Sequence, residues 1–147
     1  TSVSRGLGDV YKRQSYKGRS VVISGDTIHD GSVQKYSKDV DLLVHSAISI
    51  DIVERMRKLA PIPQMDKILL DIQDYHTSIK EAGEIARDAN VKHLLIYHSI
   101  PTPRNTLMER VFFRPIEGIF EDYTLSDDGT RVIMPVGNND IVIDKIN

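Results

Sequence analysis

The sequence contains no cysteine, so disulfides and thiolate metal ligands are excluded, and any metal site must use His, Asp, Glu or water. No apolar run approaches the roughly 20 residues that a membrane-spanning helix needs. No signal peptide is visible either, so we expect a cytoplasmic location and no membrane partner. The net charge of -2 offers no excess of basic residues, so nucleic acid is not an expected partner.

Glycine-rich phosphate loops are also missing, because neither GxGxxG nor GxxxxGK follows a predicted strand. Their absence disfavours a doubly wound receiver or nucleotide-binding domain. What is present is ordinary globular composition, with 40% hydrophobic and 27% charged residues. The 147 residues suffice for one modest domain with its own core.

The first fourteen residues, TSVSRGLGDVYKRQ, have neither a helical nor a strand period. They resemble read-through of a sequencing adapter, and we exclude them from the fold as a non-native segment. The domain is therefore expected to span residues 15–147, as the surviving part of a longer protein.

Three apolar segments, 18–24, 40–45 and 93–98, are predicted to be central parallel strands, because both of their faces are apolar. Apolar residues recur at helical spacing in 50–60 and 78–89 between them. Ser78 followed by Glu81 is a capping box, which places the start of the second helix. Asn105 is placed to cap a third helix. This alternation predicts a layered α/β domain.

The other segments are less regular. Segments 117–125 and 131–136 are predicted strands joined by the turn SDDG at 126–129, and a second turn, GNND at 137–140, precedes IVIDKI. The stretch 61–75 has two prolines, and DKILLDI within it is a candidate short helix.

Parallel strands place functional groups at their carboxyl ends. Here the first strand runs into Asp26, the second ends at His45, and the third at His98. His76 precedes the capped helix, where free backbone N–H groups favour anions over imidazolium. Taken singly, each residue also has an ordinary structural interpretation. Asp26 could form an Asx turn and His45 a cap. His98 could be a strand-end histidine and His76 a loop histidine.

Taken in order, three motifs resemble the C-terminal half of the metallo-β-lactamase superfamily, in its ribonuclease Z and arylsulfatase-like branch. They are SVVISGDT, DLLVHSA and YHTSIKEAGEIARDANVKHLLIYHSIP, within residues 18–103. The resemblance implies half of an αββα sandwich, with a sheet and flanking helices. It also implies a binuclear metal-dependent hydrolase of phosphate or sulfate esters. In such enzymes two metal ions, usually zinc, polarise the ester and generate hydroxide at neutral pH.

The resemblance also implies roles for single residues. Asp26 would bridge the two divalent ions and His98 would bind the second. His76 would act as a catalytic residue that binds the phosphate or protonates the leaving group. His45 is a second substrate-binding candidate. It could orient a neighbouring ligand, or it could simply cap the segment HSAIS that it opens.

Two departures from the family pattern stand out. The ribonuclease Z branch has His-Glu-Ala-Thr where this chain has HSAI at 45–48, which argues against tRNA processing and towards a small ester substrate. The motif His-x-His-x-Asp-His is absent, so the metal site is incomplete. We therefore expect this chain to be inactive alone, with the missing N-terminal half or a second copy as partner. The alternative function is a non-catalytic α/β interaction module.

Overall fold

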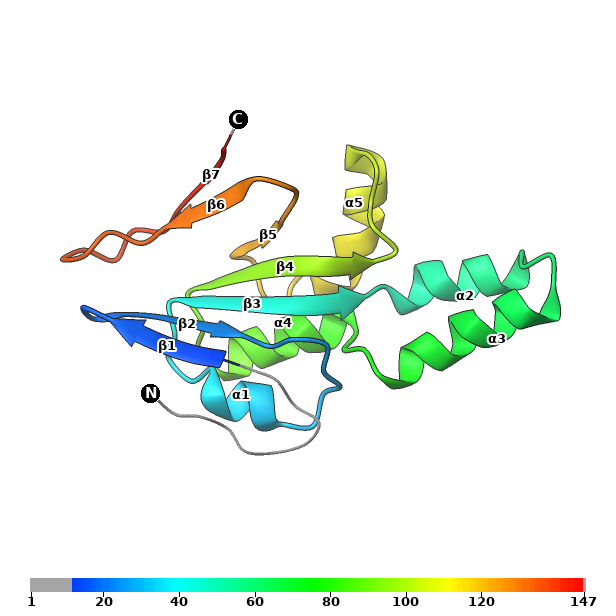
Figure 1. Cartoon of the computed structure of the whole chain (residues 1–147), viewed down its shortest axis with the longest axis horizontal. Coiled ribbons are helices and arrows are strands. Elements are labelled where there is room, and N and C mark those ends of the chain that lie inside the picture. Colours follow the sequence, from blue (N-terminus) through cyan, green and yellow to red (C-terminus); the bar gives the residue numbers. More distant parts are fainter. Residues whose placement is uncertain (1–11, 147) are drawn as a thin grey trace.

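The computed structural model describes residues 12–146, and its centre is one five-stranded sheet (Figure 1). The order is β1 (Lys12–Tyr16), β2 (Arg19–Ile23), β3 (Leu42–Ile48), β4 (His93–Ile100) and β5 (Tyr123–Leu125). Strands β2 to β5 are parallel, and β1 pairs with β2 in antiparallel orientation. The three predicted parallel strands and the α/β class are thus confirmed.

Strand β1 is the one strand of this sheet that the sequence did not predict. Residues 12–14 lie in it, within the segment expected to be irregular, so that expectation is wrong for these three residues. Lys17 and Gly18, both with positive φ (47° and 80°), form the two-residue turn into β2. The other residues of that segment, 1–11, lie outside the described part, and its non-native origin stays a prediction.

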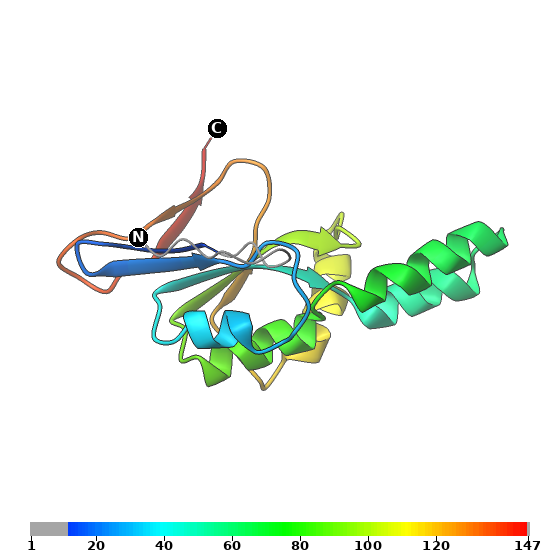
Figure 2. The ribbon, with the colours of Figure 1, turned by 60° about the horizontal axis from the view of Figure 1, so that its bottom comes forward.

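Helices cover one face of the sheet, as Figure 2 shows. They are α1 (Ser32–Tyr36), α4 (Ile79–Asp88), α5 (Thr106–Phe113) and the short η2 (Arg114–Ile116). The predicted capping box of α4 is present: the Ser78 hydroxyl accepts from the Glu81 N–H, and the Glu81 carboxylate accepts from the Ser78 N–H. The predicted cap of α5 is confirmed, since Asn105 Oδ1 accepts from the Met108 N–H at 2.9 Å.

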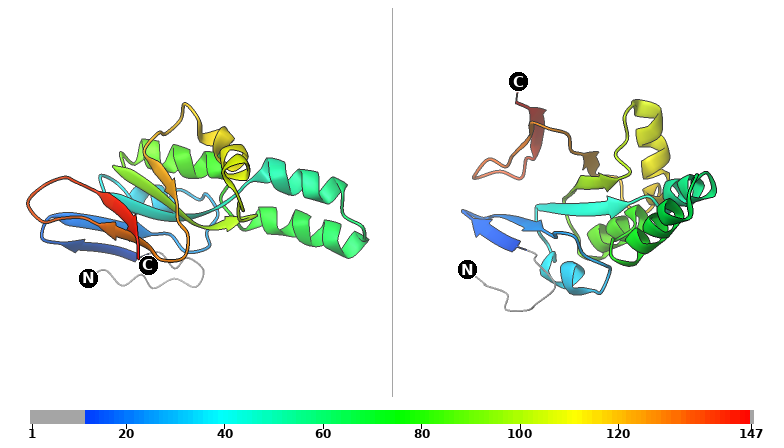
Figure 3. Two further views of the ribbon diagram at one scale, coloured as in Figure 1. Left: turned by 90° about the horizontal axis from the view of Figure 1, so that it is seen from above. Right: turned by 45° about the vertical axis from the view of Figure 1, so that its right-hand side comes forward.

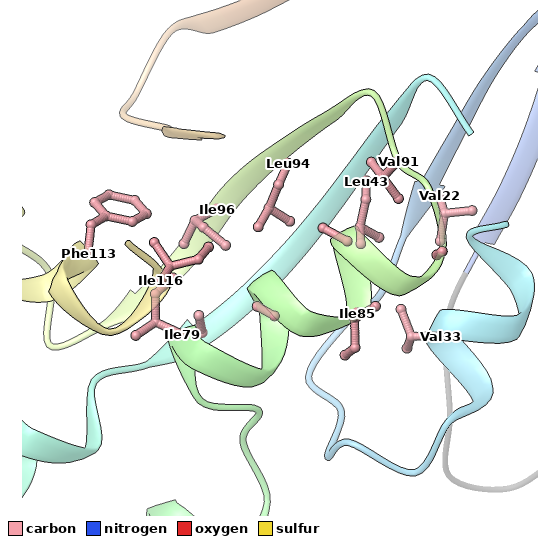
Figure 4. Packing of buried hydrophobic residues seen from close by; sticks show 14 of the residues in the cluster. Val22, Val33, Leu43, Ile79, Ile85, Val91, Leu94, Ile96, Phe113 and Ile116 are labelled. Atoms are coloured by element: carbon pink, nitrogen blue, oxygen red, sulfur yellow. The ribbon is translucent and has the colours of Figure 1, made fainter. Parts of the chain in front are cut away.

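The hydrophobic core lies between the sheet and α4, as Figure 4 shows. Apolar residues of α4 recur three or four positions apart and form one buried stripe. The core includes Val22, Leu43, Leu94 and Ile96 from the strands, Ile79, Ile85 and Ala86 from α4, and Phe112, Phe113 and Ile116 from the segment around α5. This packing fixes the sheet, whose carboxyl edge carries the predicted site.

A helical arm extends from that edge of the sheet (Figure 1). It consists of α2 (Ile50–Lys58), α3 (Pro63–Asp71) and η1 (Ile72–Asp74), and we call residues 50–74 the arm. Its first helix was predicted, and α3 contains all but the last residue of the candidate helix DKILLDI. Every helix within residues 12–146 is too short or too polar to cross a membrane.

The tail forms a separate two-stranded sheet of β6 (Thr130–Ile133) and β7 (Val142–Lys145). The predicted strand at 117–125 is reduced to β5, which pairs with β4 in parallel. The SDDG turn therefore does not join a hairpin, as its two flanking strands lie in different sheets. The topology is decided by the pairing of β5 with the buried strand β4, which a turn sequence alone does not predict.

Three charged residues meet at the amino edge of the sheet. Arg19 begins β2, and Asp41 and Lys92 each precede a parallel strand. Lys92 Nζ lies 2.7 Å and Arg19 Nη2 3.4 Å from Asp41 Oδ1. Burial alone would raise the pKa of Asp41, but the Lys92 hydrogen bond and the Arg19 charge hold it below its ordinary value. Arg19 also donates to the carbonyls of Asn138 and Asp140, which attaches the tail.

Gly83 lets η2 approach α4 closely. A Cβ at this position would lie 2.3 Å from Ile116 Cγ1, far inside van der Waals contact. We expect Gly83→Ala to lower the free energy of unfolding by about 1–2 kcal/mol, since overpacking of about 1–3 kcal/mol outweighs the helix propensity gained. Urea unfolding measures the change. Glu84→Ala, the neighbouring substitution in the same helix, is the control, and equal losses for both variants would contradict the steric explanation.

Candidate metal centre

Asp26 lies in the loop that follows β2, at the carboxyl edge of the sheet. Gly25, at φ 67°, turns the chain there. Its carbonyl accepts hydrogen bonds from the hydroxyls of Ser24 at 2.9 Å and Ser46 at 3.0 Å. These bonds fix the backbone just before Asp26, while its carboxylate stays exposed.

His98 is held by an irregularity within β4. Ser46 pairs with Tyr97 and Ala47 with Ser99, so His98 is an extra residue without a partner in β3. Its φ of 45° is unusual for a residue other than glycine. The sequence placed His98 at the end of the strand, but the strand continues to Ile100. Bulges re-aim a side chain and recur next to active sites, and this one points His98 toward Asp26.

His76 reaches the same edge from the segment between the arm and α4. The neighbouring Thr77 donates from its N–H at 3.0 Å and its hydroxyl at 2.6 Å to the Thr27 carbonyl. Thr27 directly follows Asp26, so these two bonds join the loop of Asp26 to the segment of His76. Residues fifty positions apart in sequence are thereby held together.

Asp26, His76 and His98 form one group at this edge. His98 Nδ1 lies 3.0 Å from Asp26 Oδ1, and ligand atoms of all three residues lie within 4.8 Å of one another. The rings of His76 and His98 meet edge to face, with centroids 5.8 Å apart. Burial lowers the pKa of His76, the Asp26 charge opposes this shift, and His98 adds to it. His76 is therefore neutral at pH 7, the form that can bind a cation.

The donors of this group fit a divalent cation. One carboxylate and two imidazoles are suitable zinc ligands, and catalytic zinc sites keep three protein ligands and an open position. Tetrahedral ligation at about 2.1 Å separates ligand atoms by about 3.4 Å, close to the spacing of Asp26 and His98. In addition, His76 Nδ1 is buried and has no hydrogen-bond partner among the described residues.

His45 does not join this group. It lies on β3, has no exposed surface and donates from Nδ1 to the Ser46 carbonyl at 2.6 Å. Burial lowers its pKa to about 4. A substrate therefore has no direct access to His45 in this structure, which argues against its predicted contact with substrate.

Three of the four predicted site residues thus come together, and one does not. The bulge at His98 and the Thr27–Thr77 connection were not predicted from the sequence. Neither has a sequence pattern, because both depend on the register between segments far apart in the chain. The charged cluster at the amino edge was missed as well, although Arg19, Asp41 and Lys92 each stand close before an apolar run.

Comparison of the sequence with known proteins found relatives named ribonuclease Z, while no family model matches. Ribonuclease Z of Mycolicibacterium paratuberculosis is 39% identical over 89 residues, which are 60% of this chain and 29% of that protein. Ribonuclease Z of Mycolicibacterium gilvum is 36% identical over 90 residues, 61% of this chain and 29% of the relative. The chain thus spans less than a third of the length of these relatives.

Comparison with solved structures supports the fold. The metallo-β-lactamase fold protein YhfI from Bacillus subtilis superimposes with a TM-score of 0.51 at 19% identity. The match covers 77% of this chain and 39% of YhfI. At that identity it shows the fold alone. The predicted relationship is confirmed: this chain has part of the metallo-β-lactamase fold and is ribonuclease Z-like in the sequence that it shares with its relatives.

Proposed function

We propose that this chain is part of a metal-dependent hydrolase that cleaves phosphodiester bonds, with Asp26 and His98 as metal ligands. The observation that carries the proposal is the grouping of Asp26, His76 and His98, from three separate segments, at the carboxyl edge of the parallel sheet. Functional sites of open α/β sheets gather at that edge. An interaction module would have no need to bring these three side chains together.

Each residue has a proposed task. Asp26 and His98 would hold the divalent ions, Asp26 through its carboxylate and His98 through an imidazole nitrogen. A bound divalent ion would polarise the phosphoryl oxygens of the substrate. His76, neutral and half-buried beside them, binds the phosphate or gives a proton to the leaving oxygen. As a neutral ring it can offer the phosphate a hydrogen bond, and it must take up a proton before it can protonate the leaving oxygen.

The substrate class follows from the relatives. Both reported relatives are named ribonuclease, so we propose RNA as the substrate of the whole protein. This replaces the expectation of a small ester, which rested on HSAI at 45–48, and the expectation of no nucleic-acid partner, which rested on net charge. Net charge misleads here because phosphates are recognised by local groups and by ions, which a sum over the chain does not show.

The centre in this chain is incomplete. No two of its histidines stand two positions apart, so the motif His-x-His-x-Asp-His is absent from it. Asp26 and His98 alone leave little protein ligation for a pair of ions. We therefore propose that this chain binds a cation but hydrolyses no substrate by itself, and that the missing half of the domain completes the centre.

Cation binding by this chain tests the proposal. Calorimetric titration with Zn²⁺ should show binding to the unaltered chain, and Asp26→Asn and His98→Ala should each weaken it at least about 10-fold, since even outer-shell changes cost that much. His76→Gln should weaken it less, because its proposed task concerns the substrate.

His93→Gln is the matched control, because His93 is a half-buried histidine of the same strand that bonds Thr124 outside the group. Its affinity for Zn²⁺ should equal that of the unaltered chain. The proposal fails if Zn²⁺ does not bind, or if Asp26→Asn binds it as tightly as His93→Gln does.

A sulfate ester or small phosphate ester is the second candidate substrate. It is favoured by HSAI at 45–48, which lacks the carboxylate of the ribonuclease Z branch. Fluorescence anisotropy of a labelled single-stranded RNA in the presence of Zn²⁺ separates the two candidates. Zn²⁺-dependent RNA binding that is lost in Asp26→Asn favours RNA. Absence of RNA binding, together with Zn²⁺-dependent binding of phenyl sulfate, favours the second candidate.

A further inference from the structure

Gly25, the residue before Asp26, is held through both of its backbone polar groups. Its carbonyl accepts hydrogen bonds from the hydroxyls of its neighbour Ser24 and of Ser46, the latter at 3.0 Å. Its N–H donates to the hydroxyl of Tyr97. The regular pairing of β2 with β3 ends at Ile23, so Gly25 lies beyond it. The side chains of Ser46 and Tyr97 therefore attach Gly25 to the sheet where backbone pairing has ended.

Ser46 and Tyr97 are partners in the register of two neighbouring strands. Ser46 lies on β3 and Tyr97 on β4, which run side by side, as Figure 3 shows. Successive side chains of a strand point to opposite faces. Because His45 points to the helix-covered face, Ser46 and its partner Tyr97 point to the opposite face. From there the two side chains reach Gly25, at the end of a third strand.

The same pair stands directly before the bulge in β4. Ser46 pairs with Tyr97, and the next pair is Ala47 with Ser99, so the unpaired His98 follows Tyr97 in the chain. Tyr97 thus connects to both candidate ligands. Its hydroxyl holds the residue before Asp26, and its backbone leads into His98. The 3.0 Å between His98 Nδ1 and Asp26 Oδ1 joins residues 72 positions apart, and Tyr97 links the two segments that carry them.

A metal centre needs this kind of support. Ligand atoms have to be held within about 0.5 Å of the productive geometry, and the exposed Asp26 side chain cannot hold itself there. Hydrogen-bonding groups that orient a ligand from outside the coordination shell affect metal affinity about 10- to 100-fold. Ser46 is 0% exposed, and a buried hydroxyl has to be hydrogen-bonded. The Gly25 carbonyl satisfies it, so this contact is a fixed part of the packed structure.

We propose that Ser46 and Tyr97 are positioning residues of the candidate metal centre, which hold the Asp26 carboxylate beside His98 by fixing Gly25. The inference rests on the proposed cation site and on no particular substrate. It also gives a task to Ser46, which stands where the ribonuclease Z branch has glutamate. A glutamate carboxylate only accepts hydrogen bonds and could not donate to the Gly25 carbonyl, whereas the serine hydroxyl does.

Calorimetric titration of the full chain with Zn²⁺ tests the proposal. Tyr97→Phe removes only the hydroxyl and should weaken binding about 10-fold. Ser46→Ala should weaken it less, because Ser24 still donates to the same carbonyl. Tyr123→Phe is the matched control, because Tyr123 lies on the neighbouring strand β5 and its ring stacks on Phe113, outside the group. Its affinity should equal that of the unaltered chain.

Co²⁺ in place of Zn²⁺ separates positioning from a general loss of stability. The visible absorption of bound Co²⁺ depends on the number and geometry of its ligands. At saturating Co²⁺ the spectrum of Tyr97→Phe should differ from that of the unaltered chain, and the spectrum of Tyr123→Phe should not. A variant that had lost only stability would keep the unaltered spectrum, and circular dichroism confirms that each variant is folded.

Amide hydrogen exchange of the metal-free chain, followed by NMR, tests the contact itself. The Gly25 amide should exchange several-fold faster in Tyr97→Phe, because it loses its acceptor. The Thr77 amide, which bonds the Thr27 carbonyl, should be unchanged. Unchanged exchange of Gly25, or equal Zn²⁺ affinity of Tyr97→Phe and Tyr123→Phe, overturns the inference. If Asp26→Asn alone weakens Zn²⁺ binding, only the positioning role is wrong. If the unaltered chain binds no Zn²⁺, the proposed function is wrong as well.

Discussion

Replacing Asp41 with alanine is expected to lower the free energy of unfolding by about 3–5 kcal/mol, the usual loss when one partner of a buried ion pair is removed. Asp41 is 4% and Arg19 7% exposed. Without the carboxylate, the Arg19 guanidinium keeps two backbone carbonyls as its acceptors among residues 12–146 and has no opposite charge beside it there. The backbone N–H of Ser20, which bonds Asp41 at 2.8 Å, loses its partner as well. Chemical unfolding followed by circular dichroism measures the loss.

Asp144→Ala is the matched control for this prediction. Asp144 also pairs with an arginine, Arg131, through two hydrogen bonds of 2.7 and 2.8 Å, but both side chains are exposed. Exposed pairs contribute about 0–1 kcal/mol, so this variant should be nearly as stable as the unaltered chain. If Asp41→Ala and Asp144→Ala lose the same free energy, burial is not what makes the amino-edge cluster important.

Acid is expected to destabilise the chain through His45, by roughly 3 kcal/mol between about pH 6.5 and pH 4. The folded chain holds this buried imidazole neutral, and its pKa falls from 6.5 to about 4. In the unfolded chain the ring takes up a proton below pH 6.5. Unfolding therefore binds a proton in this window, so stability rises with pH from about 4 to 6.5 and is constant above it.

Urea unfolding of His45→Asn at a series of pH values isolates this contribution. Asparagine retains a donor near the position of Nδ1, which can still serve the Ser46 carbonyl, but it does not titrate. The variant should lose less stability on acidification than the unaltered chain. His76 and His93, whose pKa values burial also lowers, are present in both proteins and cancel in the difference. Parallel pH curves for the two proteins would refute the assignment.

Local patterns predicted the elements that depend on local chemistry. Helix α4 begins where Ser78 and Glu81 form a capping box, and α5 begins after Asn105, because these side chains satisfy backbone groups a few residues away. The parallel strands β2, β3 and β4 were identified by their apolar residues on both faces. Strand β1 was not predicted, because it is exposed throughout and owes its place to pairing with β2.

The candidate site divides in the same way. Asp26 and His98 could be selected from the sequence, because polar residues at the ends of apolar strands must lie at one edge of a parallel sheet. His45 met the same criterion but is buried, since its side chain points to the helix-covered face of β3, where Leu43 and Ala47 also lie. Strand alternation gives two faces, but only packing decides which face is covered.

The sequence by itself determined the chemistry available to this protein: no thiolate ligands, and a carboxylate and histidines at strand ends and at a helix start. These follow from residue identity and from spacing over a few positions. Only the tertiary structure decided that Asp26, His76 and His98 converge and that His45 is enclosed. Each of these depends on contacts between residues many positions apart, whose free energy is set by the packed sheet and helices rather than by any short segment.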